Sequence, residues 1–222
     1  MILEKMFNEE YLIESVAKED FPLTFKIDKP TATFQKRFGD GKELPRKLNR
    51  LISSVFSQNI REDVLRNLKK LKTEVIITCG PKVAQVGGRT VGRNKIYLAM
   101  DTPLSNIGDY LVHEIIHILT INNIEGFRLL ADQTDKIVKK GLKPGATLKN
   151  FLIGKRGYGA ADINRKEEPL AYFGNASMDF SLLTPDAIKK LSALLFNGQV
   201  FNVRTFKMVV DRLRNQKPMV LS

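Results

Sequence analysis

The chain has 222 residues, of which 43% are hydrophobic and 27% are charged, so it can bury a core as one large domain or two small lobes, and wholesale disorder is excluded. No stretch reaches the roughly 18 uncharged apolar residues of a membrane span, and residues 1–20 lack the apolar run of a signal peptide. The net charge is +12, and the single cysteine, Cys79, excludes an internal disulfide. Because Cys79 follows an apolar run, we expect it to be buried at the end of a strand.

The first part of the chain is expected to be an accessory segment covering residues 1–40, followed by a main domain over 41–222. Within this part, residues 8–18 suit a short amphipathic helix. Residues 23–43 are expected to be extended or irregular, since they contain Pro30 and a Gly-Asp-Gly turn signal.

Two helices and two strands are predicted next. A helix begins at Pro45, and a second helix fits residues 61–71 with its apolar side chains inward. The apolar stripe of the first helix recurs at three- and four-residue spacing: Leu48, Leu51, Ile52, Val55 and Phe56. The period then changes, and 74–78 and 93–100 are predicted strands, with Gly87-Gly88 as a turn between them.

The remainder of the chain is expected to be mostly helical. A helix is predicted from about Ser105 to Thr120 and another over 125–140. Residues 141–163 contain five glycines and a proline, which predicts a long loop. Three further helices are predicted over 165–178, 184–196 and 204–215, the second of them with a cap at Thr184.

One motif carries a chemical signal: His113-Glu114-Ile115-Ile116-His117 contains both histidines of the chain in an HExxH pattern. Residues four apart lie on the same face of a helix, so His113 and His117 can bind one ion, while Glu114 lies about 100° around the axis and can reach a metal-bound water. The flanking residues are apolar almost all round, and imidazoles in such a core are costly unless they are paired or bind a metal. The motif therefore predicts a zinc site, although two histidines and a carboxylate also suit iron or manganese.

A third ligand must be a carboxylate, because no other histidine exists. The downstream candidates are Glu125, Asp132, Asp135, Glu167, Glu168 and Asp179. We choose Glu168, because it lies in an apolar helical stretch and Ala171, one turn later, is small enough to let that helix approach the zinc helix. The alternative for the Glu167-Glu168 pair is a purely electrostatic role at a helix N-terminus.

The motifs together resemble a known family. HEIIH, followed about fifty residues later by Glu168-Pro169-Leu170-Ala171, is similar to the gluzincin metallopeptidases, and Tyr158-Gly159 before the second helix resembles the catalytic domain of the anthrax lethal factor group. This resemblance implies an α+β, zincin-like fold with a small mixed sheet, an active-site helix and a mostly helical C-terminal lobe. It also implies Glu168 as a zinc ligand and Tyr158 as a residue that stabilises the transition state. Tyr172 is the alternative tyrosine for this role, and Tyr158 is otherwise an ordinary loop residue.

These features predict a zinc-dependent endopeptidase in which Glu114 is the general base. In zincins the edge strand before the zinc helix pairs with an extended substrate, so we assign substrate binding to Lys95, Ile96, Tyr97, Leu98, Ala99 and Met100.

Two alternatives remain open: a basic protein that binds nucleic acid or a protein scaffold and keeps a zincin fold, and a regulatory peptidase that cuts one protein partner, similar to the type that cleaves phage repressors. Basic residues are concentrated in 36–72, with eleven against four acidic residues, and in 139–166, with eight against one. Such a surface attracts anionic partners or is a solvated face. We expect a protein retained in the cytoplasm; delivery within a virus particle or a toxin system would leave no mark in the sequence.

Overall fold

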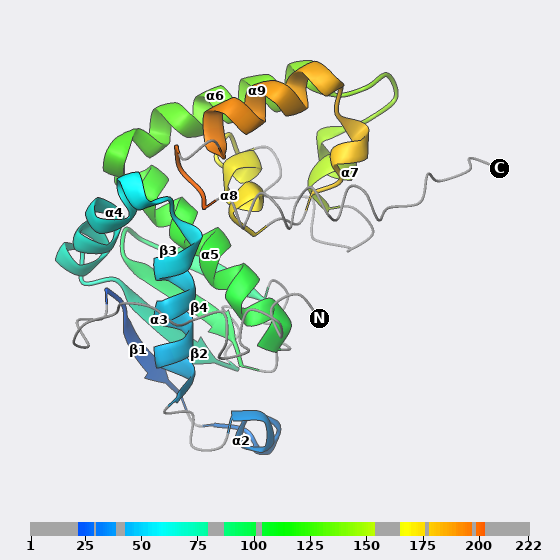
Figure 1. Cartoon of the computed structure of the whole chain (residues 1–222). Helices are drawn as coiled ribbons and strands as arrows, with labels where there is room; N and C mark the ends of the chain where they lie inside the picture. Colours follow the sequence, from blue (N-terminus) through cyan, green and yellow to red (C-terminus); the bar gives the residue numbers. More distant parts are fainter. Residues whose placement is uncertain are drawn as a thin grey trace.

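The structure of the chain is a computed structural model, and it describes residues 22–28, 30–38, 43–79, 87–100, 104–153, 165–175, 178–196 and 199–202. Within these residues the architecture is mixed α+β, with a four-stranded sheet and eight α-helices (Figure 1). The helices expected over 8–18 and 204–215 lie outside the described residues.

The sheet has the strand order β1-β2-β4-β3 and consists of β1 (Thr24–Ile27), β2 (Glu74–Thr78), β3 (Gly88–Val91) and β4 (Lys95–Ala99). β1, β2 and β4 run parallel, and β3 is antiparallel to β4. The strands predicted over 74–78 and 93–100 are confirmed as β2 and β4. β1 pairs with β2 over its whole length, so residues 24–27 belong to this sheet, although the expected boundary at residue 40 assigns them to an accessory segment.

β3 occupies the place where the sequence predicts only a turn. Gly87 has a φ of 67°, a left-handed conformation that favours glycine, but Gly88 already pairs with Leu98 as the first residue of the strand. A Cβ atom on Gly88 would lie 3.1 Å from the Cβ of Tyr110, so the absence of a side chain lets β3 approach the helix that contains Tyr110.

β4 is not the edge strand that the sequence analysis expected. It is hydrogen-bonded to β2 on one side and to β3 on the other, and the main chain of Met100 donates to Thr78 O at 3.0 Å. A strand paired on both sides offers no main-chain groups to a substrate. The prediction of substrate binding through main-chain hydrogen bonds was therefore wrong for Lys95, Ile96, Tyr97, Leu98, Ala99 and Met100. Among the described strands, β1 and β3 are the edges of the sheet.

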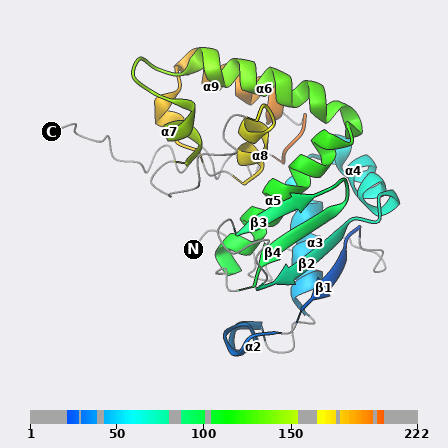
Figure 2. The same cartoon turned by 180° about the vertical axis from the view of Figure 1, so that it is seen from behind.

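Three helices belong to the sheet side of the molecule: α3 (Glu43–Val55), α4 (Gln58–Lys70) and α5 (Leu104–Ile121). α3 and α5 lie against one face of the sheet, as the two opposite views show (Figures 1 and 2). The alternating strand residues Val75, Ile77, Ile96 and Leu98 are fully buried, and the predicted apolar stripe of α3 is buried as well. We call β1–β4 with α3, α4 and α5 the sheet layer.

The second layer is helical and contains α6 (Phe127–Gly141), α7 (Leu148–Ile153), α8 (Glu168–Asn175) and α9 (Pro185–Leu195). We call it the helical layer; α6 and α9 lie side by side in it, and α8 lies between α6 and α5 (Figure 1). The predicted helices over 125–140, 165–178 and 184–196 are confirmed with shifted ends, and the Thr184 side chain accepts a hydrogen bond from Ala187 N at 3.4 Å.

Two short helices were not predicted. α7 lies inside the stretch expected to be a loop, and α2 (Ala32–Phe38) lies inside the stretch expected to be extended or irregular. Both are shorter than two turns of apolar periodicity, so the sequence contains too few repeats to distinguish them from irregular chain.

A row of phenylalanine rings in contact with one another connects the sheet layer to α8 of the helical layer. Phe56, at the end of α3, stacks on Phe201 at a ring distance of 6.2 Å, and Phe196 contacts both Phe201 at 5.9 Å and Phe173 of α8 at 5.9 Å. Phe173 also packs against Phe180 at 5.4 Å. These buried rings fix the position of α8 relative to the sheet layer.

Two other expectations concern single features. Cys79 is exposed just after β2, so the prediction that it is buried was wrong. None of the described helices combines the length and the apolar character that crossing a membrane requires.

Candidate metal centre

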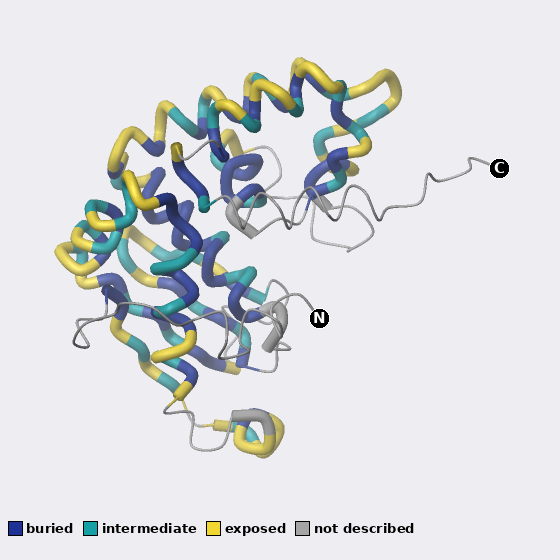
Figure 3. The backbone as a smooth tube through the Cα atoms, viewed as in Figure 1, coloured by how far each residue is buried: buried dark blue, intermediate teal, exposed yellow. Residues whose placement is uncertain are grey.

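The two histidines of the motif lie one turn apart on α5. This helix is buried along most of its length, as the dark blue tube in Figure 3 shows, because the residues around the histidines are apolar on nearly every side. The His117 residue is 5% exposed, and the side chain of His113 is 12% exposed. Their Nε2 atoms lie 3.1 Å apart, so both rings point to the same place.

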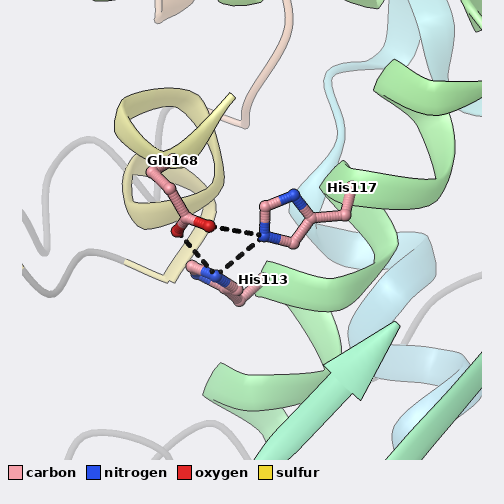
Figure 4. A group of neighbouring side chains, drawn as sticks. All are labelled: His113, His117 and Glu168. Atoms are coloured by element: carbon pink, nitrogen blue, oxygen red, sulfur yellow. Dashed lines mark hydrogen bonds and ion pairs between the residues drawn. The ribbon is translucent and has the colours of Figure 1, made fainter. Parts of the chain in front are cut away.

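α8 places the carboxylate of Glu168 opposite these rings (Figure 4). Glu168 Oε2 lies 3.3 Å from His113 Nε2, and Oε1 lies 3.4 Å from His117 Nε2. Glu168 is the first residue of α8 and Pro169 the second, a position where proline is tolerated because its missing N–H has no partner within the helix. Ala171 is fully buried, and α8 packs closely on α5.

The donor atoms and their spacing fit a tetrahedral divalent metal ion. Two nitrogens that each lie about 2.0–2.1 Å from one tetrahedral zinc are roughly 3.3–3.4 Å apart, and a carboxylate oxygen gives nearly the same separation. The observed separations are 3.1, 3.3 and 3.4 Å. Among the described residues, His113, His117 and Glu168 form a group of three whose ligand atoms lie within 4.8 Å of one another.

Electrostatics differ between the two histidines. Burial alone would lower the pKa of His113, but the hydrogen bond with Glu168 and the charges of Glu114 and Glu168 outweigh it and raise that pKa above its ordinary value. Burial, with the adjacent His113 and the positive charge of Arg165, holds the pKa of His117 well below its ordinary value. This shift favours the neutral imidazole of His117, which is the form that binds a metal.

Glu114 lies beside the cluster and is held by the sheet. Its Oε2 accepts a hydrogen bond of 2.7 Å from the hydroxyl of Thr90 in β3, and the same hydroxyl lies 3.1 Å from the main-chain carbonyl oxygen of Glu114. Glu114 is 6% exposed, and burial raises the pKa of its carboxyl group, against the opposing effects of His113 and the Thr90 hydrogen bond. A buried carboxyl group with a raised pKa is suited to accept and return a proton.

Of the two candidate tyrosines, only one is described. The ring of Tyr172, on α8, meets the ring of His113 edge to face at a centroid distance of 4.8 Å. This contact restricts the rotation of the His113 ring. Tyr158 lies outside the described residues.

The structure places several other candidate carboxylates away from the histidines. Asp132 forms an ion pair with Lys166 at 3.6 Å, and Asp135 forms one with Lys139 at 2.9 Å. Asp179 accepts a hydrogen bond from Ser181 N at 3.0 Å. Glu168 is thus the carboxylate that the fold brings to the two imidazoles.

Thr90 and Gly88 are the residues near the site that sequence reasoning did not find. Both lie on the face of β3 that is turned toward α5. The hydroxyl of Thr90 reaches the carboxylate of Glu114, and a Cβ on Gly88 would lie 3.3 Å from Glu114 Cγ. The available signal was the Gly-Gly pair followed by a short β-branched segment, because glycine in a strand often marks a close backbone approach.

Comparisons with models of known protein families, with curated proteins and with solved structures found no match to this chain.

Proposed function

We propose that the chain is a zinc-dependent endopeptidase of the gluzincin type with a zincin-like fold. The observation that carries the proposal is the convergence of His113 and His117 from α5 and Glu168 from α8 on one point, with the buried carboxylate of Glu114 beside it. A structural role for this cluster would not require Glu114 to be held by a hydrogen bond from a separate strand.

In this proposal His113, His117 and Glu168 would hold the zinc ion, and the ion would supply Lewis-acid activation of water and of the peptide carbonyl group. Glu114 takes a proton from the attacking water and passes it to the nitrogen of the leaving amine. Tyr158 is proposed to donate a hydrogen bond to the developing oxyanion, a role that rests on the family resemblance.

The substrate would lie along β3 rather than β4. β3 ends the sheet on the side of α5 among the described strands, and an extended peptide can add to such an edge through main-chain hydrogen bonds. The residues of β3 that face α5 touch Glu114, so a peptide paired with this strand would pass close to the proposed general base.

The first prediction tests this function directly. Glu114→Gln removes the proton acceptor but none of the three ligands, so we expect peptide hydrolysis to fall by about 10²–10⁴-fold while zinc stays bound. The measurement is a peptide-library digest of both chains together with metal analysis, which also tests whether iron or manganese is present instead.

The outcome separates the proposed peptidase from its alternatives. Full activity of Glu114→Gln would refute the role of Glu114. Bound metal without cleavage of any library peptide, together with a salt-dependent gel shift, would favour a basic nucleic-acid-binding protein. Cleavage confined to one folded protein would indicate a regulatory peptidase.

A further inference from the structure

We propose that Thr90 is a positioning residue for Glu114, and that β3 thereby couples substrate binding to placement of the general base. This inference rests on the proposed function. It assigns a role to a side chain 24 positions away from Glu114 in the sequence.

The contact is short and directional. A threonine hydroxyl has one proton to donate, and the carboxylate oxygen at 2.7 Å is a closer acceptor than the carbonyl oxygen at 3.1 Å. A hydrogen bond to a charged oxygen is about twice as strong as one between neutral groups. The hydroxyl therefore fixes one carboxylate oxygen and limits rotation of the carboxylate plane.

The strand is fitted closely to the general base. Gly88 and Thr90 alternate along β3, pair with Leu98 and Ile96 of β4, and both face α5. A methyl group on Gly88 would lie 3.3 Å from Glu114 Cγ and 3.1 Å from Tyr110 Cβ, so a side chain at this position would press against the general base and the helix that carries it.

The position of β3 gives this contact a consequence for catalysis. A peptide that adds to the outer edge of β3 restrains the strand through the main chain. Since the hydroxyl of Thr90 projects from the same strand, fixing the strand also fixes Glu114 relative to the bound peptide. Correct placement of a proton acceptor within about 1 Å affects the rate by roughly 10²-fold.

The test compares Thr90→Val, which keeps the shape but lacks the donor, with Thr90→Ser, which keeps the hydroxyl. For Thr90→Val we expect kcat to fall by about 10–100-fold, with KM changed by no more than about twofold and zinc content unchanged. Thr90→Ser should recover most of the rate. The matched control is Thr73→Val, because Thr73 is buried next to β2 and its hydroxyl has no partner among the described residues; this variant should keep the wild-type rate.

A second measurement does not depend on activity. Glu114→Leu removes the acceptor, so the shifts in urea midpoint caused by Thr90→Val and Glu114→Leu should be non-additive in the double variant if the hydrogen bond forms in solution. Additive shifts would overturn the contact itself.

Each result bears on the proposal. Wild-type kinetics in Thr90→Val, or an equal loss in Thr90→Ser, would overturn the positioning role, because the hydroxyl would not be what matters. If the wild-type chain cleaves no peptide, the proposed function fails and the catalytic role of Thr90 fails with it. A non-additive urea cycle would then show that the contact is structural only.

Discussion

His113 and His117 have the same side chain and lie one turn apart, yet their surroundings shift their pKa values in opposite directions. His113 faces both Glu168 and Glu114, and these acidic groups favour its protonated form. His117 is more deeply buried, and the positive charge of Arg165 adds to the effect of burial by disfavouring its protonated form. Protons therefore compete with a metal ion mainly at His113.

This asymmetry predicts how zinc affinity depends on pH. Zinc binds neutral imidazoles. The raised pKa of His113 keeps this side chain protonated below pH 6.5, so zinc must displace a proton from it there. The lowered pKa of His117 favours the neutral form, so no proton has to be displaced from that side chain. As the pH falls from 6.5 to about 5.5, we expect the Kd for zinc to increase about tenfold for each pH unit, which corresponds to one displaced proton. The measurement is competition with a chelator of known affinity.

The background for this measurement is Glu114→Gln, because Glu114 also has a raised pKa and would otherwise add its own proton to the count. The hydrogen bond with Glu168, the largest of the effects that raise the pKa of His113, remains in that variant, but the charge of Glu114 is lost, so the increase in Kd should begin at a lower pH than in the wild-type chain. A Kd that increases about a hundredfold per pH unit would mean that two protons are displaced and that His117 is not neutral in the metal-free chain.

At the residue scale, part of the site is readable from the sequence and part is not. The helical period alone places His113 and His117 on one face, and the apolar stretch around Glu168 indicates that its carboxylate is buried. The contact of Thr90 with Glu114 depends on a strand that was not recognised, because Gly87 and Gly88 hide its start. No local pattern encodes a hydrogen bond between residues 24 positions apart.

Among the elements, the packing of α9 on α6 depends on one glycine. Gly141 is the last residue of α6, and a Cβ atom there would lie 2.1 Å from the Cβ of Ala187 and 3.5 Å from its Cα. A main-chain hydrogen bond also joins the two segments here, since Thr184 N donates to Gly141 O at 2.8 Å. The two helices can approach this closely only because both residues are small.

We therefore predict that Gly141→Ala lowers the free energy of unfolding by about 1–3 kcal/mol, although alanine is intrinsically the better helix former. The measurement is urea denaturation of the metal-free chain. Ala187→Gly should restore part of the loss in the Gly141→Ala background by making room, while alone it should cost about 1 kcal/mol. A double variant whose loss equals the sum of the two single losses would contradict a steric origin.

The longer helices were found from sequence because they have enough repeats of one period. α3, α4, α5, α6 and α9 each have at least eleven residues, over which an apolar stripe is distinct. α7 has six residues, and β3 has four that begin with glycine, so neither shows a period. The error about β4 has a different cause: strand order is set by contacts between strands, and the sequence of one strand does not state its neighbours.

On the scale of the whole molecule, the candidate metal centre lies where the two layers meet. His113 and His117 belong to α5, which packs on β3 and β4, whereas Glu168 belongs to α8, which packs on α6. The row of phenylalanine rings from Phe56 to Phe173 is a second connection between α8 and the sheet layer. A metal ion held by these ligands would therefore connect the sheet layer to the helical layer.

Without an ion, the cluster itself opposes this packing. Glu168 and Glu114 are both buried near the two imidazoles, and a buried charge costs free energy unless it is fully compensated. Positive charge from a divalent ion would compensate both carboxylates at once. Folding of the helical layer should therefore be more sensitive to zinc than folding of the central strands β2 and β4.

This reasoning gives a prediction for the intact chain. At a free zinc concentration about 1,000 times the Kd, the free energy of unfolding should rise by about 4 kcal/mol, and a chelator should reverse the change. Glu168→Ala removes the ligand that α8 supplies, so most of the zinc-dependent gain should disappear, whereas Glu114→Gln should retain it because all three ligands remain. Thermal denaturation with and without zinc measures the gain, and hydrogen exchange shows where it acts, with the amides of α8 expected to lose more protection on chelation than those of β2. An undiminished gain in Glu168→Ala would mean that zinc is bound by α5 without α8, and the two layers would then not be joined through the metal.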